Sequence, residues 1–260
     1  MFVIDDLYKT FQVGAQAGIK AIDGVSLNVE TGKLLTLLGP SGCGKTTVMA
    51  MLAGFDSPTQ GEIIFDGARI TSAGKERGVV FQGDDSLYNW LTAIENIEFG
   101  LRLGGLPPKA RRERALQWLH LVGLKGQQDK YPTELSGGMK QRIQIARALA
   151  NQPKTLLMDE PFGALDAQTR GTMQRELRRI WSTAGTTVLF ITHDIDEAII
   201  LGTHVGVMTA GPSGTLKSVV RIDIEGDRDR TDPRYSGYYD QIYSLIREEV
   251  QRATQRDGAG

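Results

Sequence analysis

The chain has 260 residues, of which 40% are hydrophobic, enough apolar surface for one large core or two modest ones. Its 30 basic and 31 acidic side chains give a net charge of −1, which argues against a surface built to neutralise nucleic-acid phosphates. A single cysteine excludes an internal disulfide and favours a reducing compartment. There is no signal-peptide pattern and no apolar run near eighteen residues, so we expect a cytosolic protein that meets a membrane only through a partner.

The first predicted elements are strands. Residues 2–11 and 20–29 have strand patterns, and Gly14 and Gly18 punctuate the loop between them. The apolar run 34–38 predicts a buried strand.

A phosphate-binding loop follows that strand. The pattern G-x-x-x-x-G-K-[ST] spans 39–46, and the residues after it predict a helix that ends at Gly54. Glycines let a backbone wrap a phosphate, while successive N–H groups and a helix N-terminus offer donors to an anion. We expect Lys45 to reach the β- and γ-phosphates and the Thr46 hydroxyl to ligate Mg²⁺. The residues expected to contact the nucleotide phosphates are Gly39, Pro40, Ser41, Gly42, Cys43, Gly44, Lys45, Thr46 and Thr47. A chance match is the alternative, and the strand before the loop and the helix after it argue against chance.

The middle of the chain changes from strands to helices. A strand at 62–67 ends in an Asp-Gly turn, and a strand at 77–82 ends in Gln82. Between 87 and 149 the apolar residues recur at helical spacing, with Thr92 as a helix cap. The charges of 109–114 are most simply a solvated helix face. We therefore expect a helical subdomain inserted between two parts of an α/β core.

Two further motifs supply candidate chemistry. Ser136, Gly137 and Gly138 form a capped, glycine-rich helix start, which is either a second anion site or an ordinary turn. The apolar strand that follows ends in Asp159 and Glu160. Asp159 can bind Mg²⁺ through water and Glu160 can polarise an attacking water. The alternative is a pair of solvated carboxylates at a strand end.

The last third of the chain returns to the α/β pattern. A buried strand at 186–191 is followed by His193, at the sheet edge where open α/β folds bind ligands, so this imidazole could hydrogen-bond the γ-phosphate. Another strand covers 205–208. Residues 226–232 are highly charged and predict an exposed loop, and a helix with one apolar face begins at Pro233.

In their order, these motifs resemble the ATPases of ATP-binding-cassette (ABC) transporters. The motifs in question are the phosphate loop, Gln82, 135–138, 156–160, 164–166 and His193. The resemblance implies an α/β fold: a phosphate-loop (RecA-like) ATPase core with an N-terminal antiparallel β subdomain and an inserted α-helical subdomain. The implied organisation is one cassette, 1–260, with the core at 2–86 and 152–225, the helical subdomain at 87–151, and a C-terminal loop and helix at 226–260.

The resemblance also implies roles for single residues. Phe11 is similar in position to the aromatic side chain that stacks on adenine; the alternatives are a core aromatic residue and Tyr8 in that role. Gln82 would contact Mg²⁺ and sense the γ-phosphate, and Glu160 would be the catalytic base. The implied catalytic set is Glu160, His193, Gln82 and Lys45, and the implied ligands of Mg²⁺ are Thr46, Gln82 and Asp159.

A head-to-tail homodimer follows from the same resemblance. Ser136, Gly137 and Gly138 would contact ATP held by the other subunit, and Ala164 to Asp166 would cross the dimer interface. The partners implied are two integral membrane permease subunits and, indirectly, a solute-binding protein, with no nucleic acid. The cassette would lie at the cytoplasmic face of the inner membrane.

Within the family, the chain looks most like importers of taurine, aliphatic sulfonates and nitrate. The cues are 76–82, Gly54-Phe55, 90–97 and 232–235. The segment 83–89 departs from the family pattern, since it has one extra residue and Asn89 where a proline is common.

Two alternatives stand beside the transporter interpretation. A soluble ABC-type ATPase acting on nucleic acid or ribosomes shares the core motifs, but such proteins usually carry long coiled-coil insertions or two cassettes. A nucleotide-gated binding module without turnover would not need both Glu160 and His193.

Overall fold

The computed structural model describes residues 1–12, 18–83, 86–163, 165–226 and 228–257, with the backbone alone for 252–257. The chain forms two compact units, residues 1–74 with 187–260 and residues 75–186. Both strands and helices occur along the described chain, and parallel strand pairs are joined through helices, so the predicted α/β class is confirmed. The turn at Gly14 lies outside the described residues. The boundaries predicted for the helical subdomain stay a prediction.

The first unit contains an antiparallel sheet near the N-terminus. Its order is β2 (Ile19–Val29), β1 (Phe2–Phe11), β4 (Gln60–Phe65) and β5 (Ala68–Arg69). The turn between the last two strands is the predicted Asp66-Gly67 pair, with φ angles of 49° and 82°. Both angles lie in the left-handed region that a two-residue hairpin turn of this type requires, which explains why glycine stands second.

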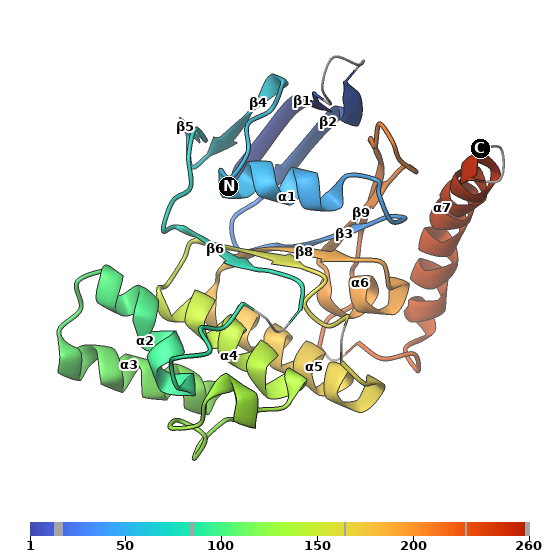
Figure 1. The fold of residues 1–260 in the computed structure, drawn as a ribbon. Helices are drawn as coiled ribbons and strands as arrows, with labels where there is room; N and C mark the ends of the chain where they lie inside the picture. Colours follow the sequence, from blue (N-terminus) through green and yellow to red (C-terminus); the bar gives the residue numbers. More distant parts are fainter. Residues whose placement is uncertain (13–17, 84–85, 164, 227, 258–260) are drawn as a thin grey trace. The chain divides into compact units, whose positions relative to one another are not determined.

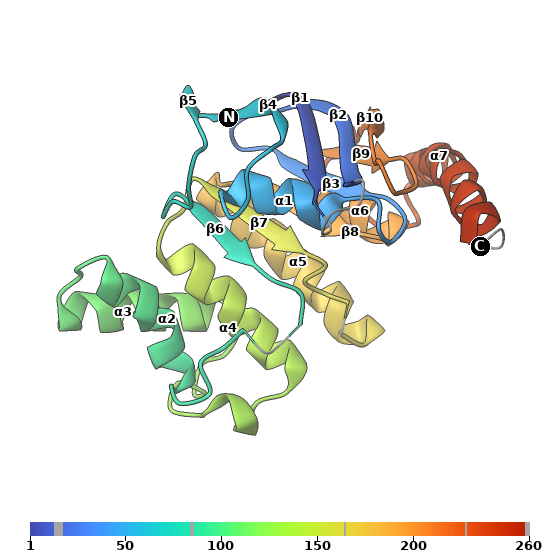
Figure 2. The same ribbon diagram turned by 45° about the horizontal axis from the view of Figure 1, so that its top comes forward.

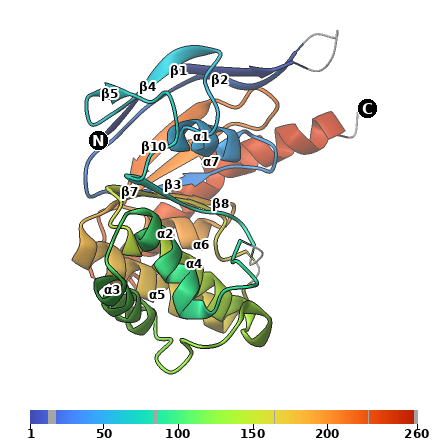
Figure 3. The ribbon, with the colours of Figure 1, turned by 60° about the vertical axis from the view of Figure 1, so that its left-hand side comes forward.

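The first unit also holds a group of mostly parallel strands. β3 (Leu34–Leu38) runs parallel to β8 (Thr187–Thr192) on one side and β9 (His204–Met208) on the other, and β10 (Leu216–Arg221) is antiparallel to β9. Helix α1 (Lys45–Ala53) lies between these strands and the antiparallel sheet, while α6 (Ile195–Leu201) and α7 (Pro233–Asp257) lie on the opposite side (Figures 1 and 3). Because both faces are covered, β3 and β8 are buried at every residue and lack polar alternation.

The second unit joins a parallel strand pair to a group of helices. β6 (Arg77–Val80) pairs with β7 (Thr155–Asp159), as Figure 2 shows. The helices are α2 (Ala93–Leu103), α3 (Pro108–Leu121), α4 (Gly137–Ala150) and α5 (Ala167–Ala184), with a short 3₁₀ turn at Pro132–Glu134. Thr92 caps α2 as predicted, in a reciprocal capping box with Glu95. No helix in the described ranges combines the length and the apolar character needed to cross a bilayer.

Two expectations about charged segments are wrong in part. Arg111 and Arg112 of the predicted solvated face both reach Glu98 of α2, whose side chain is only 14% exposed. Arg228, in the predicted exposed loop, is 9% exposed and donates to backbone carbonyls. At Arg111 and Arg228, a partner distant in sequence lowers the exposure of a charge that composition alone places in solvent, whereas Arg112 remains 43% exposed.

Two glycines with the same backbone angle provide a matched test of close packing. Gly61 and Gly67 have φ angles of 81° and 82°, but an added Cβ at Gly61 would lie 2.2 Å from the Asp6 carbonyl oxygen, whereas nothing lies within 4 Å at Gly67. Gly67→Ala should cost about 1 to 2 kcal/mol, the strain of a left-handed alanine. Gly61→Ala should cost clearly more, because the clash is with backbone. Thermal unfolding of both variants measures this, and equal midpoints would contradict it.

Candidate functional site

The predicted phosphate loop joins the buried end of β3 to the start of α1. Gly44 stands at the N-cap of α1 with φ of 97°, and a Cβ added there would lie 2.4 Å from Ile22 Cδ1. Only glycine fits both the angle and the space. Thr46 is exposed in the first turn of α1, at the N-terminus of the helix. The loop therefore presents the donors of a helix N-terminus, the arrangement that suits an anion.

Lys45 is the charged centre of this loop. Lys45 is buried, with only 6% of the residue exposed. Its Nζ donates to the carbonyl oxygens of Gly39 at 2.7 Å and Pro40 at 3.0 Å. These partners are neutral, so they satisfy the hydrogen bonds of the ammonium without cancelling its charge. A desolvated cation so held attracts phosphate strongly.

The side chain of Cys43 points into the protein, beneath the loop to which its backbone belongs. Its side chain is fully buried, and its Sγ lies 3.8 Å from Lys45 Nζ. Burial raises the pKa of the Cys43 thiol, and the neighbouring Lys45 ammonium opposes that shift only in part. The side chain thus packs the loop from below, while the backbone of the residue remains part of the phosphate-binding path.

His193 and the phosphate loop lie at the same edge of the strands in the first unit. β3 and β8 run parallel with Leu38 opposite Thr192, so the loop and His193 each follow the carboxyl end of a neighbouring strand. His193 is exposed, and the next residue, Asp194, caps α6 by accepting from the backbone N–H of Asp196 at 2.8 Å. The structure thus brings together two of the predicted site elements that lie far apart in sequence.

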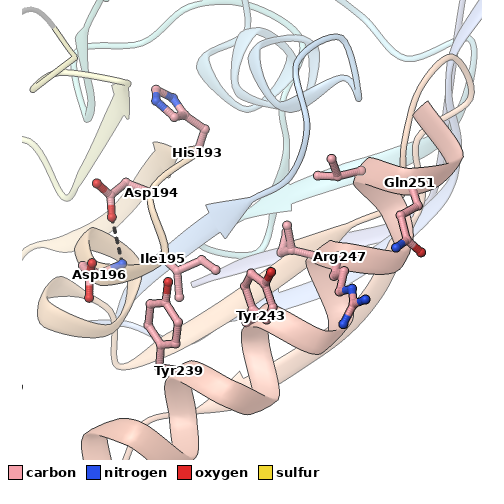
Figure 4. A pocket seen from close by; sticks show the side chains of 10 residues that line it. His193, Asp194, Ile195, Asp196, Tyr239, Tyr243, Arg247 and Gln251 are labelled. Carbon is pink, nitrogen blue, oxygen red and sulfur yellow. Dashed lines mark hydrogen bonds between the residues drawn. The ribbon is translucent and has the colours of Figure 1, made fainter. Parts of the chain in front are cut away.

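A hollow of about 460 Å³ lies beside His193 (Figure 4). One side is formed by His193 and the start of α6, and the other by Tyr239, Tyr243 and Arg247 along one face of α7. The two tyrosine rings are stacked with centroids 6.1 Å apart. This hollow was not predicted from the sequence, because its two walls are 43 residues or more apart in the chain, the separation of Asp196 and Tyr239.

Phe11 is exposed at the end of β1. Its exposed fraction is 42%, which rules out the core-aromatic alternative, and Lys9 Nζ lies 4.9 Å from the ring centroid. Tyr8, the rival, is half-buried, and a hydrogen bond to Asp6 raises the pKa of its hydroxyl. Phe11 is therefore the freer surface for a stacked base, and its role stays a prediction.

The second unit carries the other predicted strand-end residues. β6 and β7 are parallel with Val80 opposite Met158, so Gln82 and the Asp159–Glu160 pair follow the same edge of this strand pair. Asp159 is 7% exposed, and Glu160 adopts a φ of 40°. A non-glycine residue in this region stores strain, which is commonest at functional sites. The solvated-pair alternative is therefore wrong for Asp159, since that carboxylate is buried.

Ser136 and Asp166 occupy neighbouring helix starts in the second unit. Ser136 caps α4 by accepting from the Met139 N–H at 3.4 Å, and Asp166 caps α5 by accepting from the Thr169 N–H at 3.0 Å. A Cβ added at Gly138 would lie 2.8 Å from Thr169 Cγ2, so the two starts touch. The Thr169 side chain and backbone bonds lower the pKa of Asp166. Ser136, Gly137 and Asp166 are all exposed, whereas Ala164 lies outside the described residues.

Two side chains of α4 hold the segment after Gln82. Gln144 donates to the Gly83 carbonyl at 2.9 Å, and Arg147 donates to the Ser86 carbonyl at 2.8 Å. Burial lowers the pKa of Arg147, and its guanidinium lies 5.5 Å from the Tyr88 ring. Neither of these two contacts was predicted from the sequence. Two polar positions within a buried helical pattern were the available signal, although they do not identify the partner. Asp84 and Asp85 lie outside the described residues.

The oxygen donors of the candidate site suit a magnesium ion. Within the described ranges no group of three or more His, Cys, Asp or Glu side chains could hold a metal. Mg²⁺ is ordinarily bound by one or two carboxylates together with substrate phosphates and water. The Thr46 hydroxyl in the first unit, and the Gln82 amide oxygen and the Asp159 carboxylate in the second, are each a hard donor of that kind.

Comparison with known proteins gives one consistent set of relatives. The family model described as ABC transporter matches residues 22–163. An uncharacterised ABC transporter ATP-binding protein of Methanocaldococcus jannaschii is 46% identical over 95% of this chain and 91% of its own. The nitrate import ATP-binding protein NrtD of Synechocystis is 43% identical over 94% of each chain. The taurine import ATP-binding protein TauB of Escherichia coli is 41% identical over 96% of this chain and 98% of its own.

A solved structure shares the fold. A dimeric ATP-binding cassette in a post-hydrolysis state, bound to ADP and Pi, superposes with a TM-score of 0.75 at 32% identity. The match covers 86% of this chain and 100% of that chain. The phosphate-loop ATPase fold expected from the motif order is therefore confirmed.

The buried thiol of Cys43 gives a pH-dependent prediction. Only the thiolate reacts with N-ethylmaleimide, and burial both raises the thiol pKa and blocks access. The native protein should therefore react at least roughly tenfold more slowly at pH 8 than the protein unfolded in urea. Its rate should also continue to rise at pH values where the unfolded thiol has levelled off. Mass spectrometry of timed samples measures both rates, and equal rates in the two states would contradict the assignment.

Proposed function

Because the chain belongs to the ABC transporter family and is an ATPase of that family, we propose that it is the ATP-hydrolysing subunit of a membrane importer. The observation that carries the proposal is the buried Lys45 ammonium within a loop at a helix N-terminus. That arrangement suits the β- and γ-phosphates of ATP. The relatives named as import proteins support import as the direction of transport.

The proposed solute is taurine, an aliphatic sulfonate or a related small anion. The relatives that match most of the chain include one named for taurine import and one named for nitrate import. Both solutes are small: nitrate is an inorganic anion and taurine carries an anionic sulfonate group, so the class of solute is supported better than either compound. Specificity would lie in the subunits that bind the solute.

Four residues have proposed roles in hydrolysis. Lys45 would bind the β- and γ-phosphates, and Glu160 would orient the attacking water and accept its proton. His193 would donate a hydrogen bond to the γ-phosphate, and Gln82 would report the presence of that phosphate to the segment that Gln144 holds. Phe11 would stack on the adenine ring.

Magnesium would complete the nucleotide site. Thr46, Gln82 and Asp159 are the proposed protein ligands, supported by their hard oxygen donors. When bound, Mg²⁺ neutralises charge that develops on the phosphate oxygens.

The active assembly would be a head-to-tail homodimer. Ser136, Gly137 and Gly138 would contact the γ-phosphate of ATP bound to the partner, and Asp166 would cross the interface. Ser136, Gly137 and Asp166 are exposed, while Gly138 and Thr169 bring the two helix starts together, so one surface can meet a second copy. A dimeric cassette of the same fold supports the arrangement.

Two integral membrane permease subunits would recruit this dimer to the cytoplasmic face of the inner membrane. A solute-binding protein would act through those subunits, and no nucleic acid would be involved. Trp90 supports a docking role for the segment after Gln82, because it is 72% exposed and its ring lies 5.2 Å from that of Tyr88. An exposed aromatic side chain on a fixed base is typical of an interface anchor.

Changing Glu160→Gln tests the proposed base. We expect kcat to fall by roughly a hundredfold or more, since a general base contributes about that much, while the affinity for ATP is retained. Turnover is measured by phosphate release and affinity by a fluorescent ATP analogue. Glu113→Gln, at an exposed position of α3, is the matched control. An unchanged kcat in Glu160→Gln would remove this residue from the role.

The concentration dependence of turnover tests the homodimer. If Ser136 acts on ATP held by a partner, the rate per chain should rise with protein concentration and should be lost in Ser136→Arg. Ser182→Arg places the same side chain at an exposed position of α5 and should behave as wild type. A rate that is independent of concentration and unaffected by Ser136→Arg would mean that one chain contains a complete site.

A further inference from the structure

Helix α6 begins directly after His193, and hydrogen bonds fix the backbone on both sides of that residue. Thr192 donates from its hydroxyl to the Glu197 carboxylate at 2.6 Å, and both side chains are buried. The Asp194 N–H donates to the Thr192 hydroxyl at 3.0 Å. The backbone at His193 therefore follows the position of the first turn of α6.

Two residues of the C-terminal segment bind that first turn. The Tyr235 hydroxyl donates to Asp196 Oδ1 at 2.5 Å, and Arg230 donates to both carboxylate oxygens of Asp196. Tyr235 is 3% exposed, and burial followed by the bond to Asp196 raises the pKa of its hydroxyl. The hydroxyl accordingly remains protonated and continues to donate at any physiological pH.

A third residue of the same segment binds the other end of α6. The Arg228 guanidinium donates to the carbonyls of Ile199 at 2.7 Å and of Gly202, just at and beyond the last turn. A cation at a helix C-terminus meets the negative end of the helix dipole and satisfies carbonyls that have no partner within the helix. The C-terminal segment thus forms hydrogen bonds with both ends of α6.

The hydrogen bonds from the C-terminal segment to Asp196 matter because a hollow lies beside His193. Tyr239 and Tyr243 of α7 line its far wall, so the hollow adjoins the start of α6 on this side (Figure 4). On that side, the hydrogen bonds from Arg230 and Tyr235 to Asp196 restrain the first turn of α6, as closely packed side chains would otherwise do.

We propose that Arg230 and Tyr235 are positioning residues for His193, which hold the first turn of α6 so that the imidazole stays at the carboxyl edge of β8. The inference rests on the proposed role of His193 at the γ-phosphate. It assigns the C-terminal segment a part in hydrolysis rather than in binding, because the residues that hold the nucleotide in the phosphate loop belong to other elements of the first unit.

Removing single groups from the tether tests the proposal in the full-length chain. Tyr235→Phe and Arg230→Gln should each lower kcat roughly three- to tenfold, since small misplacement of a positioned group costs rate. KM for Mg-ATP should change less than twofold, and Arg230→Lys should recover part of the lost kcat. Tyr238→Phe and Arg234→Gln are the matched controls, because these residues bind Asp223 and Asp232 rather than α6. Both controls should retain the kcat of wild type.

A double-mutant cycle separates this proposal from the function it rests on. In a His193→Ala background, Tyr235→Phe should cause no further loss of kcat, because the group it positions is already gone. An equal loss in both backgrounds, or a loss no greater than in the controls, would overturn the positioning role while leaving His193 in place. A kcat in His193→Ala equal to that of wild type would instead refute the role of His193. Thermal midpoints of Tyr235→Phe and Tyr238→Phe should agree, and a kcat loss that merely tracked a lower midpoint would also overturn the proposal.

Discussion

The candidate site depends on one buried charge. Lys45 keeps an ammonium group in a residue 6% exposed, and burying a cation costs free energy unless polar groups surround it. The carbonyls of Gly39 and Pro40 supply those groups, and they can do so because the chain turns sharply at Gly44 before α1 begins. The buried strand and the helix on either side hold the two ends of the loop. The strand, the glycine and the helix, in that order, together hold one desolvated cation.

Where the physical determinant was local, the sequence was sufficient to predict the structure. Thr92 and Ser136 were expected to start helices, and both cap one by accepting from a backbone N–H three residues on. The Asp66-Gly67 turn and the stop at Gly54 follow from glycine in the left-handed region. Strand-end positions were predictable too, because a buried apolar run followed by a polar residue places that residue at a sheet edge. Each of these signals lies within a few residues of the feature it predicts.

The expectations that were wrong concern charges whose partners lie far away in sequence. Arg228 was expected in an exposed loop, yet it binds carbonyls of α6 some thirty positions earlier. Glu249 is 1% exposed, accepts from the Ala210 N–H and pairs with Lys217, although nothing around it marks it as buried. The sequence shows which side chains are charged and therefore costly to bury. It does not show which distant group will pair with a buried charge and offset that cost. The strained φ of Glu160 has the same character, since surrounding structure imposes it.

The residues proposed to contact the phosphates are held by more hydrogen bonds than the residue proposed to contact the adenine. At the adenine end, Phe11 is 42% exposed, and stacking on such a ring is weakly selective because any base offers a flat face. At the phosphate end, Lys45 is fixed by two carbonyls, and His193 precedes a helix bound at both ends. Precision is needed where bonds break, because a displaced group there loses rate while a displaced base loses only affinity. The C-terminal segment therefore contributes where the chemistry is most sensitive to position, although it is far in sequence from every nucleotide-binding motif.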